Sequence, residues 1–235
     1  MRSLMLRRRG IPHRVFGRKQ CDVTDIHAVE SAIWDGRWVV NCSSYTAVDQ
    51  AETEQEAAHR VNAIGPTNIA AVCAAAGIAL VHISTDYVFD GESPHPARED
   101  DPPRPLNVYG WSKLGGETAV REALTRHVIL RTSWVFSAHG QNFVRAILRL
   151  ARTQSELRVV NDQIGGPTAA HDIAGAILTI ICAASHDAFV GWGTYHYAGS
   201  PAVSWYEFAC AIVAGSSVAV SPIATSIIPG RRADP

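Results

Sequence analysis

Residues 78–85 read IALVHIST, and this stretch decides the fold. Residues 78–83 form an apolar run rich in β-branched side chains, which is typical of a strand buried on both faces of a parallel sheet. A helical pattern precedes this strand, acidic within residues 52–56 and rich in alanine through residues 70–76. Gly77 follows, where a glycine ends a helix in the left-handed conformation. Helix followed by buried strand predicts an α/β protein.

The same alternation continues along the chain. We predict further strands at residues 39–40, 128–136, 157–160 and 195–198. We predict further helices at residues 109–124, 142–150, 173–183 and 208–213. The last helix follows Ser204 and Glu207, which have the spacing of a capping box. Strands separated by helices indicate a Rossmann-like, doubly wound parallel sheet.

The composition excludes several classes of protein. The chain has 235 residues, of which 21 are basic and 22 acidic, so we expect no binding to nucleic acid or to a membrane surface. Its five cysteines are widely spaced without a Cys-x-x-Cys pair, and its ten histidines do not form a His-x-x-x-His pair around a glutamate. We therefore expect free thiols, no metal site and a reducing, cytoplasmic location. Neither a signal peptide nor a membrane helix is predicted.

Tyr109 and Lys113 are the first candidates for chemistry. They are four residues apart on a predicted helix, which places them on one face. A lysine ammonium favours the phenolate form, so we expect Lys113 to lower the pKa of Tyr109 towards neutrality. Thr85 follows the buried strand, at the sheet edge where α/β proteins bind ligands, with Ser84 as an alternative hydroxyl. Two competing interpretations give these residues no role in catalysis. Tyr109 and Lys113 would then be a solvated pair on the surface, and the Thr85 hydroxyl would cap a turn.

Seven stretches occur in the order typical of one family: residues 22–25 (DVTD), 41–52 (NCSSYTAVDQAE), 61–63 (VNA), 84–91 (STDYVFDG), 105–117 (PLNVYGWSKLGGE), 130–135 (LRTSWV) and 160–168 (VNDQIGGPT). Together they resemble the extended short-chain dehydrogenase/reductase family. Within that family the chain is similar to the dTDP-4-dehydrorhamnose reductase branch. The resemblance runs from about residue 20 to about residue 210.

The resemblance implies an activity. It is the reduction of the C4 ketone of dTDP-4-dehydro-L-rhamnose to dTDP-L-rhamnose by hydride from NADPH or NADH. Tyr109 would be the proton donor, Lys113 its activator and ribose contact, and Thr85 the group that holds the carbonyl. Thr85, Asp86 and Trp134 would bind the dTDP-sugar substrate.

The resemblance also implies a cofactor site and a domain plan. The cofactor residues would be Asp22, Val23, Ser44, Tyr45, Thr46, Tyr109 and Lys113. Residues 1–160 would form the dinucleotide-binding domain, and residues 161–235 a smaller substrate lobe with an interwoven boundary. Arg18 and Lys19 favour NADPH, because they follow the presumed second strand; two solvated loop charges are the equal alternative. A homodimer is left open.

The sequence departs from the family at its beginning. The Gly-x-x-Gly-x-x-Gly loop that approaches a pyrophosphate does not occur. Residues 10–16 resemble the approach to the second strand and its start, so we expect the first strand to be missing. A fragment or a misassigned start is the favoured explanation. A substitute strand at residues 2–6 and a loss of cofactor binding are the alternatives. The other end also looks shortened after residue 232.

Two other functions stay open on the sequence. One is a sugar-nucleotide epimerase or dehydratase of the same superfamily. Such enzymes share the Tyr-x-x-x-Lys motif but usually lack the sequence found here at residues 84–91. The other is a non-catalytic regulatory or binding homologue. Turnover, as distinct from ligand binding alone, would separate it from an enzyme.

Overall fold

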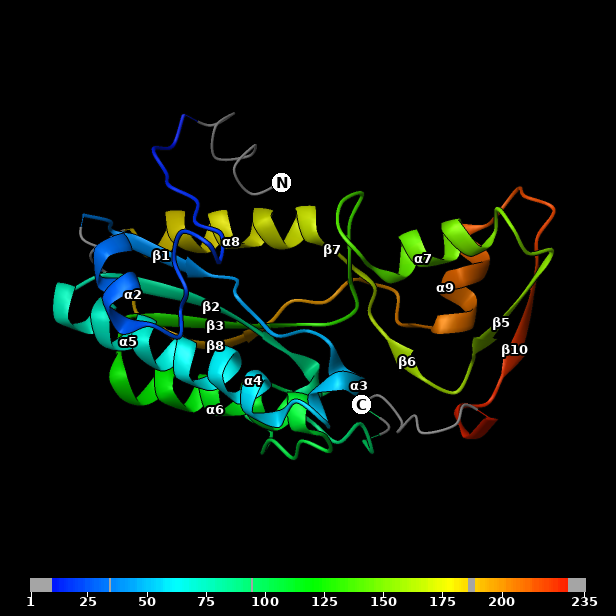
Figure 1. Cartoon of the computed structure of the whole chain (residues 1–235), viewed down its shortest axis with the longest axis horizontal. Coiled ribbons are helices and arrows are strands. Elements are labelled where there is room, and N and C mark those ends of the chain that lie inside the picture. Colours follow the sequence, from blue (N-terminus) through cyan, green and yellow to red (C-terminus); the bar gives the residue numbers. More distant parts are fainter. Residues whose placement is uncertain (1–9, 34, 94, 186–188, 228–235) are drawn as a thin grey trace. The chain divides into compact units, whose positions relative to one another are not determined.

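The computed structural model describes residues 10–33, 35–93, 95–185 and 189–227 (Figure 1). The chain divides into two compact units: Met1–Arg131 with Ala174–His196, and Thr132–Ile173 with Tyr197–Pro235. These bounds differ from the predicted division after residue 160. The chain leaves the first unit at the end of one sheet strand and returns to it later to supply another, so each unit is built from two segments.

The first unit is built on a four-stranded sheet. Its strands are β1 (Trp38–Asn41), β2 (Ala79–Thr85), β3 (His127–Thr132) and β8 (Gly193–His196), in the order β1-β2-β3-β8. The pairs β1–β2 and β3–β8 are parallel. The predicted α/β fold with a parallel sheet is therefore confirmed. In the described part of the chain, β1 forms one edge of this sheet.

Helices lie on both faces of the sheet. Figure 1 shows α5 (Gly65–Ala76) and α6 (Val108–Ala123) on one face and α8 (Ala170–Ala184) on the other. A further helix, α2 (Ile26–Ala32), packs against α5. Asp25 caps α2 by accepting a hydrogen bond from the His27 backbone N–H at 2.9 Å.

The core of this unit lies between the sheet and the helices α2, α5 and α6. Leu80 of β2 and Ile129 of β3 are fully buried and pack with Val120 of α6 and Ile69 of α5. Burying one such side chain stabilises the fold by roughly 1.5–3 kcal/mol. The strand predicted at residues 78–83 is confirmed, and Gly77 ends α5 with a φ of +65° as predicted.

The helical stretch before Gly77 is not continuous. It consists of α3 (Val48–Ala51), α4 (Gln55–His59), a π-helical turn η1 (Arg60–Ile64) and α5. Single π-helical turns are rare and are frequent at functional sites. The prediction of one long helix missed this interruption, because residue periodicity does not reveal a local change of hydrogen-bond spacing.

Two predicted strand features are wrong. Residues 11–16 form no strand, so the predicted start of a second strand is not present. The strand predicted at residues 128–136 ends at Thr132, because Trp134 has a φ of +45° and turns the chain. The separate strand β4 (Val135–Phe136) then joins the second unit. Residues 2–6, the predicted substitute strand, lie outside the described residues.

Within its described residues, the second unit has three two-stranded sheets and its own core. β5 (Glu156–Val160) pairs in parallel with β10 (Ala219–Ile223), β4 pairs with β7 (Thr168–Ala169), and β6 (Ile164–Gly165) pairs with β9 (Val203–Ser204). Its helices are α7 (Phe143–Leu150), α9 (Trp205–Ile212) and the short η3 (Thr225–Ile227).

Helix α9 begins at the capping box that the sequence predicts. The Glu207 backbone N–H donates to Ser204 Oγ at 3.0 Å, and the Ser204 backbone N–H donates to Glu207 Oε2 at 2.7 Å. The core of this unit consists of Ile147, Leu157, Val159, Ala209 and Val213. Among the described residues, no helix has the length and apolar character needed to cross a membrane.

Candidate active site

Several predicted site residues meet at the carboxyl ends of β1 and β2. Tyr109 is the second residue of α6 and is 8% exposed. Its side chain hydrogen-bonds with Thr85, at the end of β2, and with Ser44, which follows β1. The ring of Tyr87 meets the Tyr109 ring edge-on at 5.4 Å. The sheet edge predicted to bind ligands is therefore the one that gathers these hydroxyl groups.

Glycines let α6 approach its neighbours closely. A Cβ atom on Gly110 would lie 2.2 Å from the Tyr87 backbone oxygen. A Cβ atom on Gly116 would likewise lie 2.2 Å from the Asn62 backbone oxygen. Both obstacles are backbone atoms, which a rotamer change cannot move. Glycine at these two positions therefore brings Tyr109 to the ends of β1 and β2.

Tyr109 is held in its protonated form. Burial raises the pKa of Tyr109 to about 12, while the hydrogen bonds with Thr85 and Ser44 act in the opposite direction and the Asp86 charge adds to the rise. The expectation that Lys113 lowers this pKa is therefore wrong for this structure, because desolvation of the phenolate dominates. A phenol that keeps its proton at neutral pH is suited to donate it rather than to act as a base.

Lys113 lies one helical turn from Tyr109 and is 2% exposed. Its Nζ donates a hydrogen bond to the Ile83 backbone oxygen at 2.7 Å. Burial lowers the pKa of Lys113 to about 8, and the Glu117 carboxylate opposes this shift. A solvated surface pair is excluded for Tyr109 and Lys113, since both side chains are buried.

Thr85 has a structural contact in addition to its place beside Tyr109. Its Oγ1 donates to Asp86 Oδ1 at 3.0 Å and accepts from the Tyr87 backbone N–H at 3.3 Å. It thereby caps the short helix η2 (Asp86–Val88). The capping interpretation of Thr85 is thus correct, and it coexists with contact to Tyr109.

Asn62 is an organising residue that the sequence reasoning did not assign. It lies in η1 and is fully buried. Its Oδ1 accepts from Ser44 Oγ at 3.0 Å and from the Tyr45 backbone N–H at 2.8 Å. Its Nδ2 donates to the Tyr45 backbone oxygen at 3.0 Å and to Ser112 Oγ at 2.9 Å. One side chain thus joins the segment after β1 to α6. The occurrence of Asn62 in the stretch VNA (residues 61–63) was the feature of the sequence that could have indicated this role.

Four predicted cofactor residues remain. Tyr45 packs against the cluster that contains Tyr109, whereas Asp22, Val23 and Thr46 have other surroundings. Asp22 Oδ1 accepts hydrogen bonds from the Thr24 backbone N–H at 3.0 Å and from Thr24 Oγ1 at 2.9 Å, which lowers the pKa of the Asp22 carboxyl. Val23 packs on the start of α5, where a Cβ atom on Gly65 would lie 2.7 Å from its Cγ2. Thr46 is exposed. Arg18 is also exposed, with its Nε 3.9 Å from Asp22 Oδ2.

Trp134 belongs to the second unit. Its ring stacks on that of Trp205, with centroids 3.4 Å apart and planes inclined by 7°. Both indole Nε1 atoms are buried without a hydrogen-bond partner among the described residues. A Cβ atom on Gly165 would lie 2.4 Å from the Trp134 ring. Trp205 was not predicted, because nothing in the spacing of the two tryptophans indicates contact.

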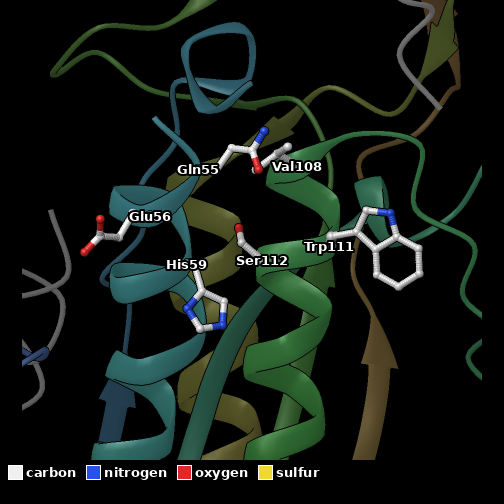
Figure 2. A pocket seen from close by; sticks show the side chains of 6 residues that line it. All are labelled: Gln55, Glu56, His59, Val108, Trp111 and Ser112. Carbon is white, nitrogen blue, oxygen red and sulfur yellow. The ribbon is translucent and has the colours of Figure 1, made fainter. Parts of the chain in front are cut away.

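A pocket of about 490 Å³ lies between α4 and α6 of the first unit (Figure 2). Its lining residues are Gln55, Glu56, His59, Val108, Trp111 and Ser112. None of the predicted site residues lines it. Among the residues that the structure describes, no group of three or more His, Cys, Asp or Glu side chains is arranged to hold a metal ion.

Comparisons with known proteins point to one family. Residues 4–235 match the family described as RmlD substrate binding domain. A dTDP-4-dehydrorhamnose reductase of Sinorhizobium fredii is 46% identical over 199 residues, which cover 82% of this chain and 66% of the relative. The spore coat polysaccharide biosynthesis protein SpsK of Bacillus subtilis is 46% identical over 180 residues, covering 77% of this chain and 61% of the relative. The chain thus spans less than two thirds of the length of either relative.

A solved structure agrees with these matches. The dTDP-4-dehydrorhamnose reductase of Bacillus anthracis, in complex with NADP, superposes with a TM-score of 0.91 at 37% identity. The superposition covers 96% of this chain and 80% of that protein.

Proposed function

The chain belongs to the RmlD substrate binding domain family, and on that premise we propose that it carries the catalytic pair of a dTDP-4-dehydrorhamnose reductase. The reaction is the reduction of the C4 ketone of dTDP-4-dehydro-L-rhamnose to dTDP-L-rhamnose. The observation that carries this proposal is a buried, protonated Tyr109 beside Thr85, with Lys113 one turn behind it.

The residues of the chain have distinct roles in this proposal. Tyr109 donates its phenolic proton to the substrate oxygen as that oxygen becomes a hydroxyl. Thr85 and Ser44 hold the phenol from the ends of the two strands. A nicotinamide cofactor, when bound, would supply the hydride for the carbonyl carbon. Lys113 has three N–H donors, of which the Ile83 oxygen takes one, so donors are left for a ribose hydroxyl.

We assign the cofactor site to the residues named from the sequence: Asp22, Val23, Ser44, Tyr45, Thr46, Tyr109 and Lys113. Asn62 supports this assignment, because its four hydrogen bonds hold Ser44 and Tyr45 beside α6. NADPH is our preferred cofactor. The exposed Arg18 and the NADP bound to the Bacillus anthracis protein support this choice.

We assign the dTDP-sugar to Thr85, Asp86 and Trp134. The φ of +45° at Trp134 supports a functional role, because strained backbone at a bulky residue is found mostly at binding and catalytic sites. In this proposal the first unit binds the dinucleotide. A cytoplasmic location completes it.

A titration followed by a turnover assay tests the function. The 235-residue chain is titrated with NADPH and NADH while nicotinamide fluorescence is recorded, and is then given the 4-keto sugar nucleotide. Micromolar binding with formation of dTDP-L-rhamnose supports the reductase. Binding without turnover supports a non-catalytic homologue. Turnover to an epimer or a dehydrated sugar supports the epimerase or dehydratase.

A further inference from the structure

Helix α6 carries a stripe of polar side chains at every fourth position: Tyr109, Lys113, Glu117 and Arg121. Residues four apart share one face of a helix. The first three are buried, with exposed fractions of 8%, 2% and 0%. The proposed function uses Tyr109 and Lys113. It gives no role to Glu117, although a fully buried carboxylate is costly unless it is paired.

Glu117 is held by two arginines. Arg131 of β3, which is 4% exposed, donates from Nε to Glu117 Oε1 at 2.9 Å and from Nη2 to Glu117 Oε2 at 2.8 Å. Arg121 donates from Nη1 to Oε2 at 3.0 Å. The two-point contact with Arg131 fixes the carboxylate in distance and direction. It also links the middle of α6 to β3 at a position one helical turn after Lys113.

The charged and titratable groups around this stripe are Tyr109, Lys113, Glu117 and Arg121 from α6, His82 from β2, Asp86 from η2, His127 and Arg131 from β3, His196 from β8, and Glu99 from the turn that contacts Arg131 and His196. Burial lowers the pKa of each of the three histidines, so they are neutral at physiological pH. Glu117 is the group that raises the pKa of Lys113 against the effect of burial.

From this arrangement we propose that Glu117 is a positioning residue of the reduction, which places its carboxylate one helical turn from Lys113 and seats α6 on β3 through Arg131. The inference rests on the proposed function, since the role of Lys113 as a ribose contact comes from there. Glu117 acts only through Lys113 and need not touch the substrate or the cofactor.

Direct measurement of the Lys113 protonation state tests the inference without an activity assay. The sequence has two lysines, Lys19 and Lys113, so selective ¹³C labelling of lysine Cε gives two resonances, with Lys19 as the internal reference. In the wild type we expect Lys113 to titrate with a pKa of about 8. In Glu117→Gln we expect the midpoint to fall by about one pH unit or more, as removal of a neighbouring opposite charge predicts.

The matched control is Glu122→Gln, which removes the same charge from an exposed position of the same helix. It should leave the Lys113 midpoint unchanged. An unmoved midpoint in folded Glu117→Gln overturns the inference. If that variant does not fold because Arg131 is left unpaired, the double variant Glu117→Gln/Arg131→Gln is compared with Arg131→Gln alone, in which Arg121 still pairs with Glu117. Equal Lys113 midpoints in these two variants overturn the inference.

The pH profile of turnover then tests the role in the reaction. The alkaline limb of kcat/KM should move to lower pH in Glu117→Gln by the shift seen in the titration, and Glu117→Asp should restore it. If the Lys113 midpoint shifts in Glu117→Gln but the alkaline limb of kcat/KM remains at the same pH, the positioning role is overturned. A wild-type chain without turnover contradicts the proposed function instead, and the lysine titration still decides whether Glu117 controls the charge of Lys113.

Discussion

Trp134 and Trp205 stack face to face, with ring centroids 3.4 Å apart and planes inclined by 7°. The two residues are far apart in sequence, and Trp134 reaches the stack through a φ of +45°. Phe143 adds a third ring, with its centroid 4.4 Å from that of Trp205. The candidate substrate residue Trp134 is therefore packed against Trp205, a side chain to which no role in binding is assigned.

Replacing Trp205 should loosen this support. We expect Trp205→Ala to lower the free energy of unfolding by roughly 3 kcal/mol, because a large ring is removed from a packed cluster. It should also abolish the near-ultraviolet circular dichroism of the stacked pair and weaken binding of the sugar nucleotide. Urea unfolding and the dichroism spectrum are the measurements. Trp111→Ala, at a ring that is 60% exposed, is the control and should change the unfolding free energy by less than about 0.5 kcal/mol.

Tyr109→Phe removes the proposed proton donor and little else. We expect turnover to fall by roughly 10²–10⁴-fold, the usual contribution of a positioned acid. The affinity for NADPH should stay within a few-fold, because the ring and its packing against Tyr87 are kept. Steady-state kinetics and fluorescence titration check both points. Tyr195→Phe, at an exposed position, serves as the control; full turnover in Tyr109→Phe would rule out the donor role.

The buried Lys113 should make stability depend on pH. Burial lowers the pKa of Lys113 to about 8 from an ordinary value of 10.5. Above pH 8 the folded chain loses this proton while the unfolded chain still binds it, so the unfolding free energy should rise with pH, by up to roughly 1.4 kcal/mol per pH unit. The window ends near the ordinary thiol pKa of 9.0, because burial raises the pKa of Cys73 to about 12, and above pH 9.0 this group opposes the rise with a slope of similar size.

Urea unfolding across that window measures the effect. Lys113→Met, which keeps an apolar side chain of similar length without a titrating group, should remove the rise. A rise that persists in Lys113→Met would assign the pH dependence to another group.

The close approach of α6 should not tolerate a side chain at Gly116. A Cβ atom there would lie 2.2 Å from the Asn62 backbone oxygen, so Gly116→Ala must displace η1 or α6. We expect a loss of about 1–3 kcal/mol of stability, as in other overpacked cores, together with weaker cofactor binding. Thermal unfolding and fluorescence titration are the measurements.

Gly175 in α8 provides the matched control. Nothing lies within 4 Å of a Cβ atom at that position, so Gly175→Ala should stabilise the helix by roughly 0.5–1 kcal/mol. If the two substitutions had equal effects, the close contact at Gly116 would not explain the result.

The sequence by itself determined the elements whose signals are local. The buried strand at residues 78–83, the helix end at Gly77 and the capping box of Ser204 and Glu207 all appear as predicted. Each depends on side-chain periodicity or on hydrogen bonds between residues a few positions apart. The spacing of Tyr109 and Lys113 likewise predicted that both residues lie on one helix face. The order of the motifs along the chain indicated the family.

Tertiary structure alone decided the features that depend on distant neighbours. Asn62 bonds to Ser112, which is 50 positions away in sequence, and Glu117 bonds to Arg131 on another element. The direction of the Tyr109 pKa shift was wrong in the sequence argument, because spacing reveals the neighbouring lysine but not the loss of water around the phenol. Desolvation and long-range pairing arise only when separate elements pack together, and no local pattern in the chain records them.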